Sequence, residues 1–217
     1  MNKLVQTISA SSAALCLLLL GTGMAANAAD AIPYPNVGTY NATSYSFTAA
    51  NTGDVIAYFV GGGTAGYTNE MGLLVNGVQT AAGFGLNNHA TAVGTSFDLG
   101  PVTAGDSLVF VLNNLSLGKK AYSDPGMNVT YDDPGVTGHN HVYSTAYTAT
   151  SPVFGTVPAG AYVAFEDLVF PNSDFNYNDE SFVFTNVGTT SVPEPASIAL
   201  LLSGGLPLLA LKRRARG

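Results

Sequence analysis

Short β-prone runs separated by turn residues recur along most of the chain, and they restrict its fold more than any other feature. The runs are rich in Val, Phe, Tyr and Thr and are bounded by Gly, Pro, Asn or Asp. They occupy residues 43–47, 54–60, 71–75, 107–112, 127–131, 141–147, 161–168 and 180–185. No apolar pattern of period 3.6 appears between the chain ends. The pattern therefore predicts an all-β protein with a single antiparallel β-sandwich or jelly-roll-like domain over residues 29–191.

One hairpin is indicated directly by its turn. Asn76-Gly77 lies between the apolar residues 73–75 and Val78. Both positions of a two-residue hairpin turn need a positive φ, which Asn and Gly adopt readily. We expect two antiparallel strands on either side of this pair.

The first 28 residues have the composition of a signal peptide. Lys3 gives a positive start, residues 13–20 are apolar, and Ala26-Asn27-Ala28 is a small-residue cleavage site. We therefore expect export, and a mature chain that starts near Ala29.

Residues 192–217 form three blocks that suggest a second sorting segment. Pro193, Glu194 and Pro195 are followed by an apolar run over residues 196–211 and by the basic tail 212–216. The prolines favour an extended backbone around Glu194. As a helix the apolar run would span only about 24 Å, less than the roughly 30 Å hydrocarbon core, with its basic tail on the cytoplasmic side. We expect transient membrane insertion through this C-terminal hydrophobic helix.

The order of triplet, apolar block and Arg-rich end resembles the PEP-CTERM sorting signal of Gram-negative bacteria. The resemblance implies that an exosortase cleaves near Pro193-Glu194-Pro195 and removes the membrane segment. The protein is then expected to cross the inner membrane and to remain at the cell surface or in the extracellular matrix. Exosortase would be its processing partner, and exopolysaccharide a candidate contact.

The segment between the two sorting signals is strongly acidic. All 14 Asp and Glu residues lie within residues 29–195, where the only Lys or Arg residues are Lys119 and Lys120. A surface that binds nucleic acid needs clusters of Lys and Arg, so this class of partner is excluded. The single cysteine, Cys16, lies in the predicted signal peptide, which leaves no disulfide, thiolate metal site or cysteine nucleophile.

Acidic and amide side chains are concentrated within residues 165–184. If the runs 161–168 and 180–185 pair as antiparallel neighbours, Glu166 and Asp167 lie beside Asp179 and Glu180. Two carboxylates 4 Å apart repel by roughly 4 kcal/mol at an effective dielectric of 20, and Ca²⁺, which takes 6–8 oxygen ligands, would remove that cost. The alternative is a turn held by Asx hydrogen bonds. The predicted ligands of a structural Ca²⁺ are Glu166, Asp167, Asp174, Asn176, Asn178 and Asp179.

The same stretch resembles a family signature. Phe165-Glu166-Asp167-Leu168, followed by Asp174-Phe175-Asn176-Tyr177-Asn178-Asp179, is similar to the F-E-D-L…D-x-D-Y-N-D motif of a domain-of-unknown-function family common in bacterial surface proteins. The resemblance covers residues 159–185 and implies a β-sandwich with a calcium site. Asn176 stands where the family has its middle aspartate, which removes one formal charge.

Three other patterns compete with the calcium site. His139 and His141 on one strand face, with His89, could form a zinc site, although histidines bonded to backbone explain the same pattern. Residues 61–66 satisfy G-x-G-x-x-G, but no helix follows, so we expect a loop without a nucleotide. Asp132-Asp133 precedes Pro134-Gly135 and is predicted to be part of a turn.

These observations favour a protein that is not an enzyme. We expect a structural or adhesive component of the cell surface or exopolysaccharide matrix, with a structural calcium ion. The first alternative is a calcium-dependent carbohydrate-binding module, in which loop tyrosines stack on a sugar; the candidates are Tyr67, Tyr122, Tyr143 and Tyr177. The second is a polysaccharide-processing enzyme.

Overall fold

Eleven strands and one short 3-10 helix make up the computed structural model over its described residues, which are 33–193 except 63, 136–137 and 150–153. The predicted signal peptide over residues 1–28, Glu194, Pro195 and the apolar run 196–211 lie outside the described residues. The strands are β1 (Thr43–Ala49), β2 (Gly53–Gly61), β3 (Asn69–Val75), β4 (Val78–Gly85), β5 (Ser96–Val102), β6 (Ser107–Asn114), β7 (Lys119–Tyr122), β8 (Val142–Tyr147), β9 (Gly160–Phe165), β10 (Glu180–Phe184) and β11 (Val187–Pro193).

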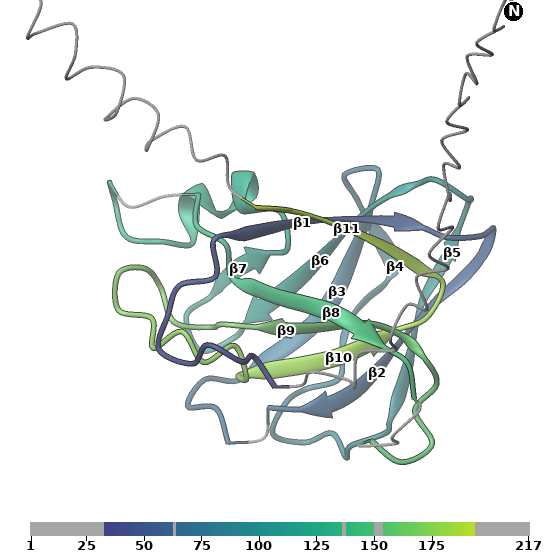
Figure 1. Cartoon of the computed structure of the whole chain (residues 1–217), viewed down its shortest axis with the longest axis horizontal. Coiled ribbons are helices and arrows are strands. Elements are labelled where there is room, and N and C mark those ends of the chain that lie inside the picture. Colours follow the sequence, from purple (N-terminus) through teal and green to yellow (C-terminus); the bar gives the residue numbers. More distant parts are fainter. Residues whose placement is uncertain (1–32, 63, 136–137, 150–153, 194–217) are drawn as a thin grey trace, which may run out of the picture.

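The strands form two antiparallel sheets, which confirms the all-β prediction. One sheet has the order β11-β1-β6-β3-β4, with β7 also paired to β6, and the other has the order β5-β2-β10-β9-β8. Figure 1 shows β8, β9 and β10 in front of β6 and β3. β3 and β4 are joined at Asn76-Gly77, where both residues have a positive φ, as the hairpin prediction requires.

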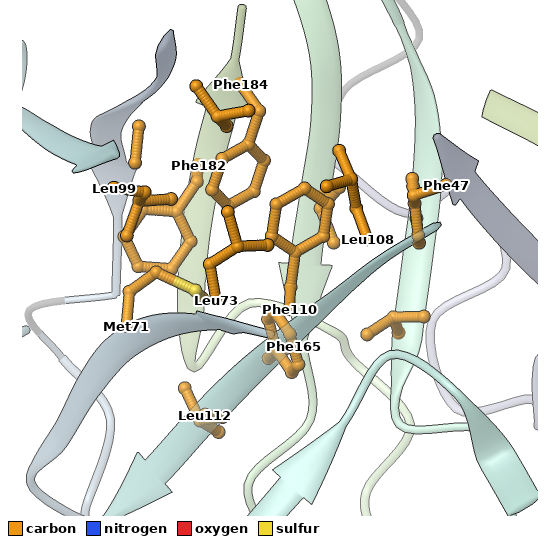
Figure 2. Close-up of a cluster of buried hydrophobic side chains, with 14 of the residues drawn as sticks. Phe47, Met71, Leu73, Leu99, Leu108, Phe110, Leu112, Phe165, Phe182 and Phe184 are labelled. Carbon is orange, nitrogen blue, oxygen red and sulfur yellow. The ribbon is translucent and has the colours of Figure 1, made fainter. Parts of the chain in front are cut away.

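The main core lies between the two sheets, so the fold is β-sandwich-like. Phe110 of β6 stacks on Phe184 of β10, with 3.8 Å between ring centroids, and joins the sheets at their centre (Figure 2). Phe182, Leu73 and Met71 surround this pair and are buried. Burial of such large apolar side chains is the main favourable contribution to stability.

A second cluster covers the outer face of the β5-β2-β10-β9-β8 sheet. Tyr162 of β9 and Val183 of β10 pack there against Tyr34, Tyr143 and Tyr177. Because both faces of β9 and β10 are buried, their sequences read as continuous apolar runs rather than as alternating ones. Two of the tyrosines suggested as sugar platforms, Tyr143 and Tyr177, are buried in this cluster, so that suggestion is wrong for them.

The prediction of a strand over residues 127–131 is wrong. A 3-10 helix, Pro125–Thr130, occupies this stretch because Pro125 suits a first helical turn and the Asp124 side chain accepts a hydrogen bond from the Gly126 amide. The buried Asn128 side chain fixes the turn by bonding both backbone groups of Tyr122 and the carbonyl of His139.

Three strands, β5, β7 and β11, were not predicted, and β4 was expected only as the second strand of the Asn76-Gly77 hairpin. β4, β5 and β11 lie on sheet edges, and β7 pairs with β6 alone among the described strands. β11 pairs with β1 as far as Pro193, two residues beyond the predicted domain end at residue 191. The strand β11 therefore includes the first residue of the Pro-Glu-Pro triplet.

Candidate metal centre

The pairing of β9 with β10 has the predicted register at the acidic end. Phe165 lies opposite Glu180, and the Asp179 amide donates to the Phe165 carbonyl at 3.1 Å. Glu166 and Asp167 continue directly beyond β9, so they lie beside Asp179 where it enters β10. The strand itself ends at Phe165 rather than at residue 168.

Three carboxylates converge at this point. Glu166, Asp167 and Asp179 each offer an oxygen within 4.8 Å of the other two, which is a spacing that suits a metal ion. They are only 1%, 2% and 8% exposed. The Asp179 carboxylate also accepts a hydrogen bond from the Asp167 amide at 2.9 Å. Among the described residues, no other group of three His, Cys, Asp or Glu side chains has this spacing.

The loop before Asp179 presents its polar and aromatic side chains in opposite directions. Phe175 and Tyr177 have positive φ values of 54° and 50°, and both rings pack into the outer cluster. The polar residues that alternate with them form Asx-type turns: the Asn176 amide donates to Asp174 at 3.2 Å and the Asn178 amide to Asn176 at 3.0 Å. The Asx turn considered as the alternative is thus present alongside the carboxylate cluster.

A cavity of about 500 Å³ is lined by most of the predicted ligands. Its lining includes Asp167, Asp174, Asn176, Asn178 and Asp179. The sixth predicted residue, Glu166, joins this set because its carboxylate accepts a hydrogen bond from the Asn176 amide at 3.2 Å. The prediction from spacing therefore brought together residues that are neighbours in the structure. The two exposed members, Asp174 and Asn178, lie at the rim.

The opposite wall of the cavity is the glycine-rich loop, which the sequence did not link to this site. Residues 64–67 line the cavity. Gly62 has a φ of +126°, and a Cβ there would clash with the Asp179 carbonyl oxygen, so only glycine fits. A ring nitrogen of His89 lies 2.9 Å from the Ala65 carbonyl and holds the loop from its other side.

A buried Asp132–His141 pair contacts the backbone of Glu166 and so supports the cluster. The sequence alone did not predict that these two residues form a pair. His141 Nε2 lies 2.8 Å from Asp132 Oδ1, and its Nδ1 lies 3.0 Å from the Glu166 carbonyl. His139 also approaches Asp132, at 3.5 Å, while His89 lies against the glycine-rich loop. Asp132 is 3% exposed and also accepts from the Phe170 amide, so its assignment as an ordinary turn residue is wrong.

Burial governs the protonation of these carboxyls. It raises the pKa of Glu166 to about 7, assisted by the charge of Asp174, and the pKa of Asp179 to about 8, assisted by Asp167 and Glu166. Burial also raises the pKa of Asp167, although the hydrogen bond from Asn69 opposes this. Burial opposes ionisation of Asp132 too, but the hydrogen bonds from His141 and the Phe170 amide outweigh it and lower that pKa.

The arrangement is suited to a hard divalent cation. Its inner donors are carboxylate oxygens of Glu166, Asp167 and Asp179, and a cation would compensate their mutual repulsion and their loss of hydration. Oxygens of Asp174, Asn176 and Asn178 lie around the same cavity and could complete a larger ligand set.

No protein-family model matches the chain, and comparisons with curated proteins and with solved structures also find no match.

Without a divalent cation, the protein is expected to lose stability as the pH rises from about 4 to about 8. Carboxyl groups in the unfolded chain titrate near pH 4, whereas Glu166 and Asp179 in the folded protein titrate near 7 and 8. The folded state therefore holds more protons in this window, and each extra proton lowers the free energy of unfolding by about 1.4 kcal/mol per pH unit. Thermal unfolding in EDTA at pH 5 and pH 8 measures the effect. A melting temperature that rises with pH would contradict it.

Proposed function

We propose that this chain is an exported, exosortase-processed protein of the cell surface or exopolysaccharide matrix, in which a calcium ion stabilises a β-sandwich-like domain. Its role is structural or adhesive rather than enzymatic. The observation that carries the proposal is the buried cluster of Glu166, Asp167 and Asp179 at one end of the sandwich. With its only cysteine in the predicted signal peptide, the domain lacks disulfides and would gain rigidity from a cation instead.

Calcium suits this donor set better than other divalent ions. Three carboxylates and the nearby amide and carboxylate oxygens of Asp174, Asn176 and Asn178 form an oxygen-only set, which matches the 6–8 ligands of Ca²⁺. Magnesium requires a smaller octahedron and retains its waters. Zinc prefers histidine and cysteine ligands, and the His139 and His141 rings approach Asp132 instead of this cavity.

The position of β11 is compatible with cleavage at the triplet. Among the described strands, β11 lies at an edge of its sheet and pairs only with β1, and it includes Pro193. A protease acting just beyond Pro193 would cut next to the sheet edge without disturbing either core. In the part of the chain that the structure describes, no helix is long and apolar enough to cross a membrane.

Calcium is expected to raise the melting temperature. At a hundredfold excess over Kd, binding to the folded state alone stabilises by about 2.7 kcal/mol, which for a domain of this size is roughly 5–11 °C. Asp179→Asn, which removes a buried ligand, should abolish the shift, and Asp174→Asn at the rim should reduce it. Differential scanning fluorimetry with calcium, magnesium or EDTA measures these shifts.

Asp54→Asn is the matched control for the loss of one negative charge. Asp54 is exposed at the start of β2, the opposite end of that strand from Gly61 and the cavity wall. This variant should show the full calcium shift. An equal shift for wild type and Asp179→Asn would mean that calcium binds elsewhere on the acidic surface.

Processing at both ends is expected in the native host. The mature species should begin near Ala29 and end between Pro193 and Ala196. Intact-mass analysis of the protein recovered from the cell surface or matrix determines both ends. A mature form that still carries residues 200–217 would contradict exosortase cleavage and leave an ordinary tail anchor.

A calcium-dependent carbohydrate-binding module is a second candidate, favoured by the cavity beside the cluster. Its volume of about 500 Å³ accommodates a small sugar, and Tyr67 lines it together with Asp174 and Asn178. A glycan array probed with calcium should give signals that EDTA removes and that Tyr67→Ala weakens. Signals that persist in EDTA, or that Tyr67→Ala leaves unchanged, would assign binding to another surface.

A further inference from the structure

The sandwich core ends in a layer of polar side chains near the carboxylate cluster. Asn69 of β3 lies opposite Asn114 of β6, and both continue the inward-facing positions of Met71 and Leu112. Glu180 of β10 lies opposite Phe165 and continues the inward-facing row of Phe182 and Phe184 (Figure 2). All three polar side chains therefore enter the space between the sheets at one end.

Asn114 is fully engaged in this layer. Its side-chain nitrogen donates to the Tyr131 hydroxyl at 3.2 Å and to the Asp167 carbonyl at 3.3 Å. Its side-chain oxygen accepts from the Leu117 amide at 2.9 Å. Every polar atom of this amide side chain has a partner, so Asn114 itself needs no ligand.

Asn69 and Glu180 differ from Asn114. The Asn69 side-chain nitrogen donates to Asp167 Oδ2 at 2.7 Å, but its Oδ1 has no hydrogen-bond partner among the described residues. Neither carboxylate oxygen of Glu180 has a partner there either. Both residues are 0% exposed. Buried acceptors without donors are costly and rare, so these three oxygens indicate a missing partner. Asn69 contacts Asp167 directly, and the charges of Glu70 and Asp167 both act on Glu180.

A charge count supports the same conclusion. Glu166, Asp167, Asp179 and Glu180 are four carboxyl groups that are at most 8% exposed. When all four are ionised, one divalent cation balances two of them. The lysines of the domain do not supply the remainder: Lys119 donates to the Tyr131 carbonyl at 2.8 Å, and Lys120 lies over the Phe84 ring.

We propose that this end of the sandwich binds two calcium ions, the second between Glu180, Asn69 Oδ1 and Asp167, with the Asp167 carboxylate shared by both ions. The first ion belongs to the Glu166–Asp167–Asp179 cluster, so the inference rests on the proposed function. Asp167 is suited to the shared role because one of its oxygens belongs to that cluster and its Oδ2 already contacts Asn69. Two divalent ions balance the four charges of Glu166, Asp167, Asp179 and Glu180, while the fifth buried carboxylate, Asp132, is paired with His141.

Native mass spectrometry of the purified protein, titrated with Ca²⁺ and compared with EDTA, tests the proposal. Wild type should bind two ions, and Glu180→Gln, which keeps the shape but removes the charge, should bind one. Asp54→Asn should still bind two, which excludes loose adducts on the acidic surface. If Glu180→Gln does not fold, Asn69→Leu removes the unpartnered oxygen from the other sheet and should also bind one ion.

The outcomes separate the two proposals. A wild-type protein that saturates with one ion overturns the second site and leaves the proposed calcium function intact. Two ions in both wild type and Glu180→Gln also overturn it, because Glu180 would then be a neutral buried acid. A wild type that binds no calcium overturns the proposed function itself.

Discussion

The antiparallel register of β9 and β10, with Phe165 opposite Glu180, is the constraint on which the rest of the structure depends. Side chains alternate between the two faces of a strand, so a slip of one residue would turn Phe182 and Phe184 out of the main core. The same slip would separate Asp179 from Glu166 and Asp167. Hydrophobic burial of the phenylalanines therefore holds the carboxylates together against their repulsion, and the acidic cluster depends on the core for its geometry.

Sequence alone predicted the parts of the fold in which local and tertiary preferences agree. The runs that became β1, β2, β3 and β6 are apolar because they face the core, and their boundaries lie within two residues of the observed strands. An edge strand such as β4 has no fully buried residue, so hydrophobic alternation marks it weakly. Residues 127–131 look β-prone, but a proline and the Asp124 cap determine the local backbone there. The 3-10 helix therefore depends on capping hydrogen bonds, which cannot be predicted from the hydrophobic pattern.

The residues of the candidate site also fall into two groups, those that spacing in the sequence could predict and those that it could not. Its inner carboxylates directly follow β9 and directly precede β10, two strands that are adjacent in sequence and in space, so their meeting could be predicted from spacing. Its supporting residues come from elsewhere: Asn69 is 98 residues from Asp167, and His141 is 25 residues from Glu166. No spacing rule connects such positions. Gly62 could have been suspected from the run of three glycines, but only the structure places it against Asp179.

The loop that carries Asp174, Asn176 and Asn178 is held by contacts that involve no metal. Tyr177 is 0% exposed, and its hydroxyl accepts a hydrogen bond from the Asn41 amide at 3.0 Å, while Phe175 packs against the same outer cluster. These anchors fix the alternate polar side chains toward the cavity before any ion arrives. A bound cation would then lose little energy to loop ordering. Its binding would act mainly on the buried carboxylates, and so on the global stability of the sandwich rather than on the order of one loop.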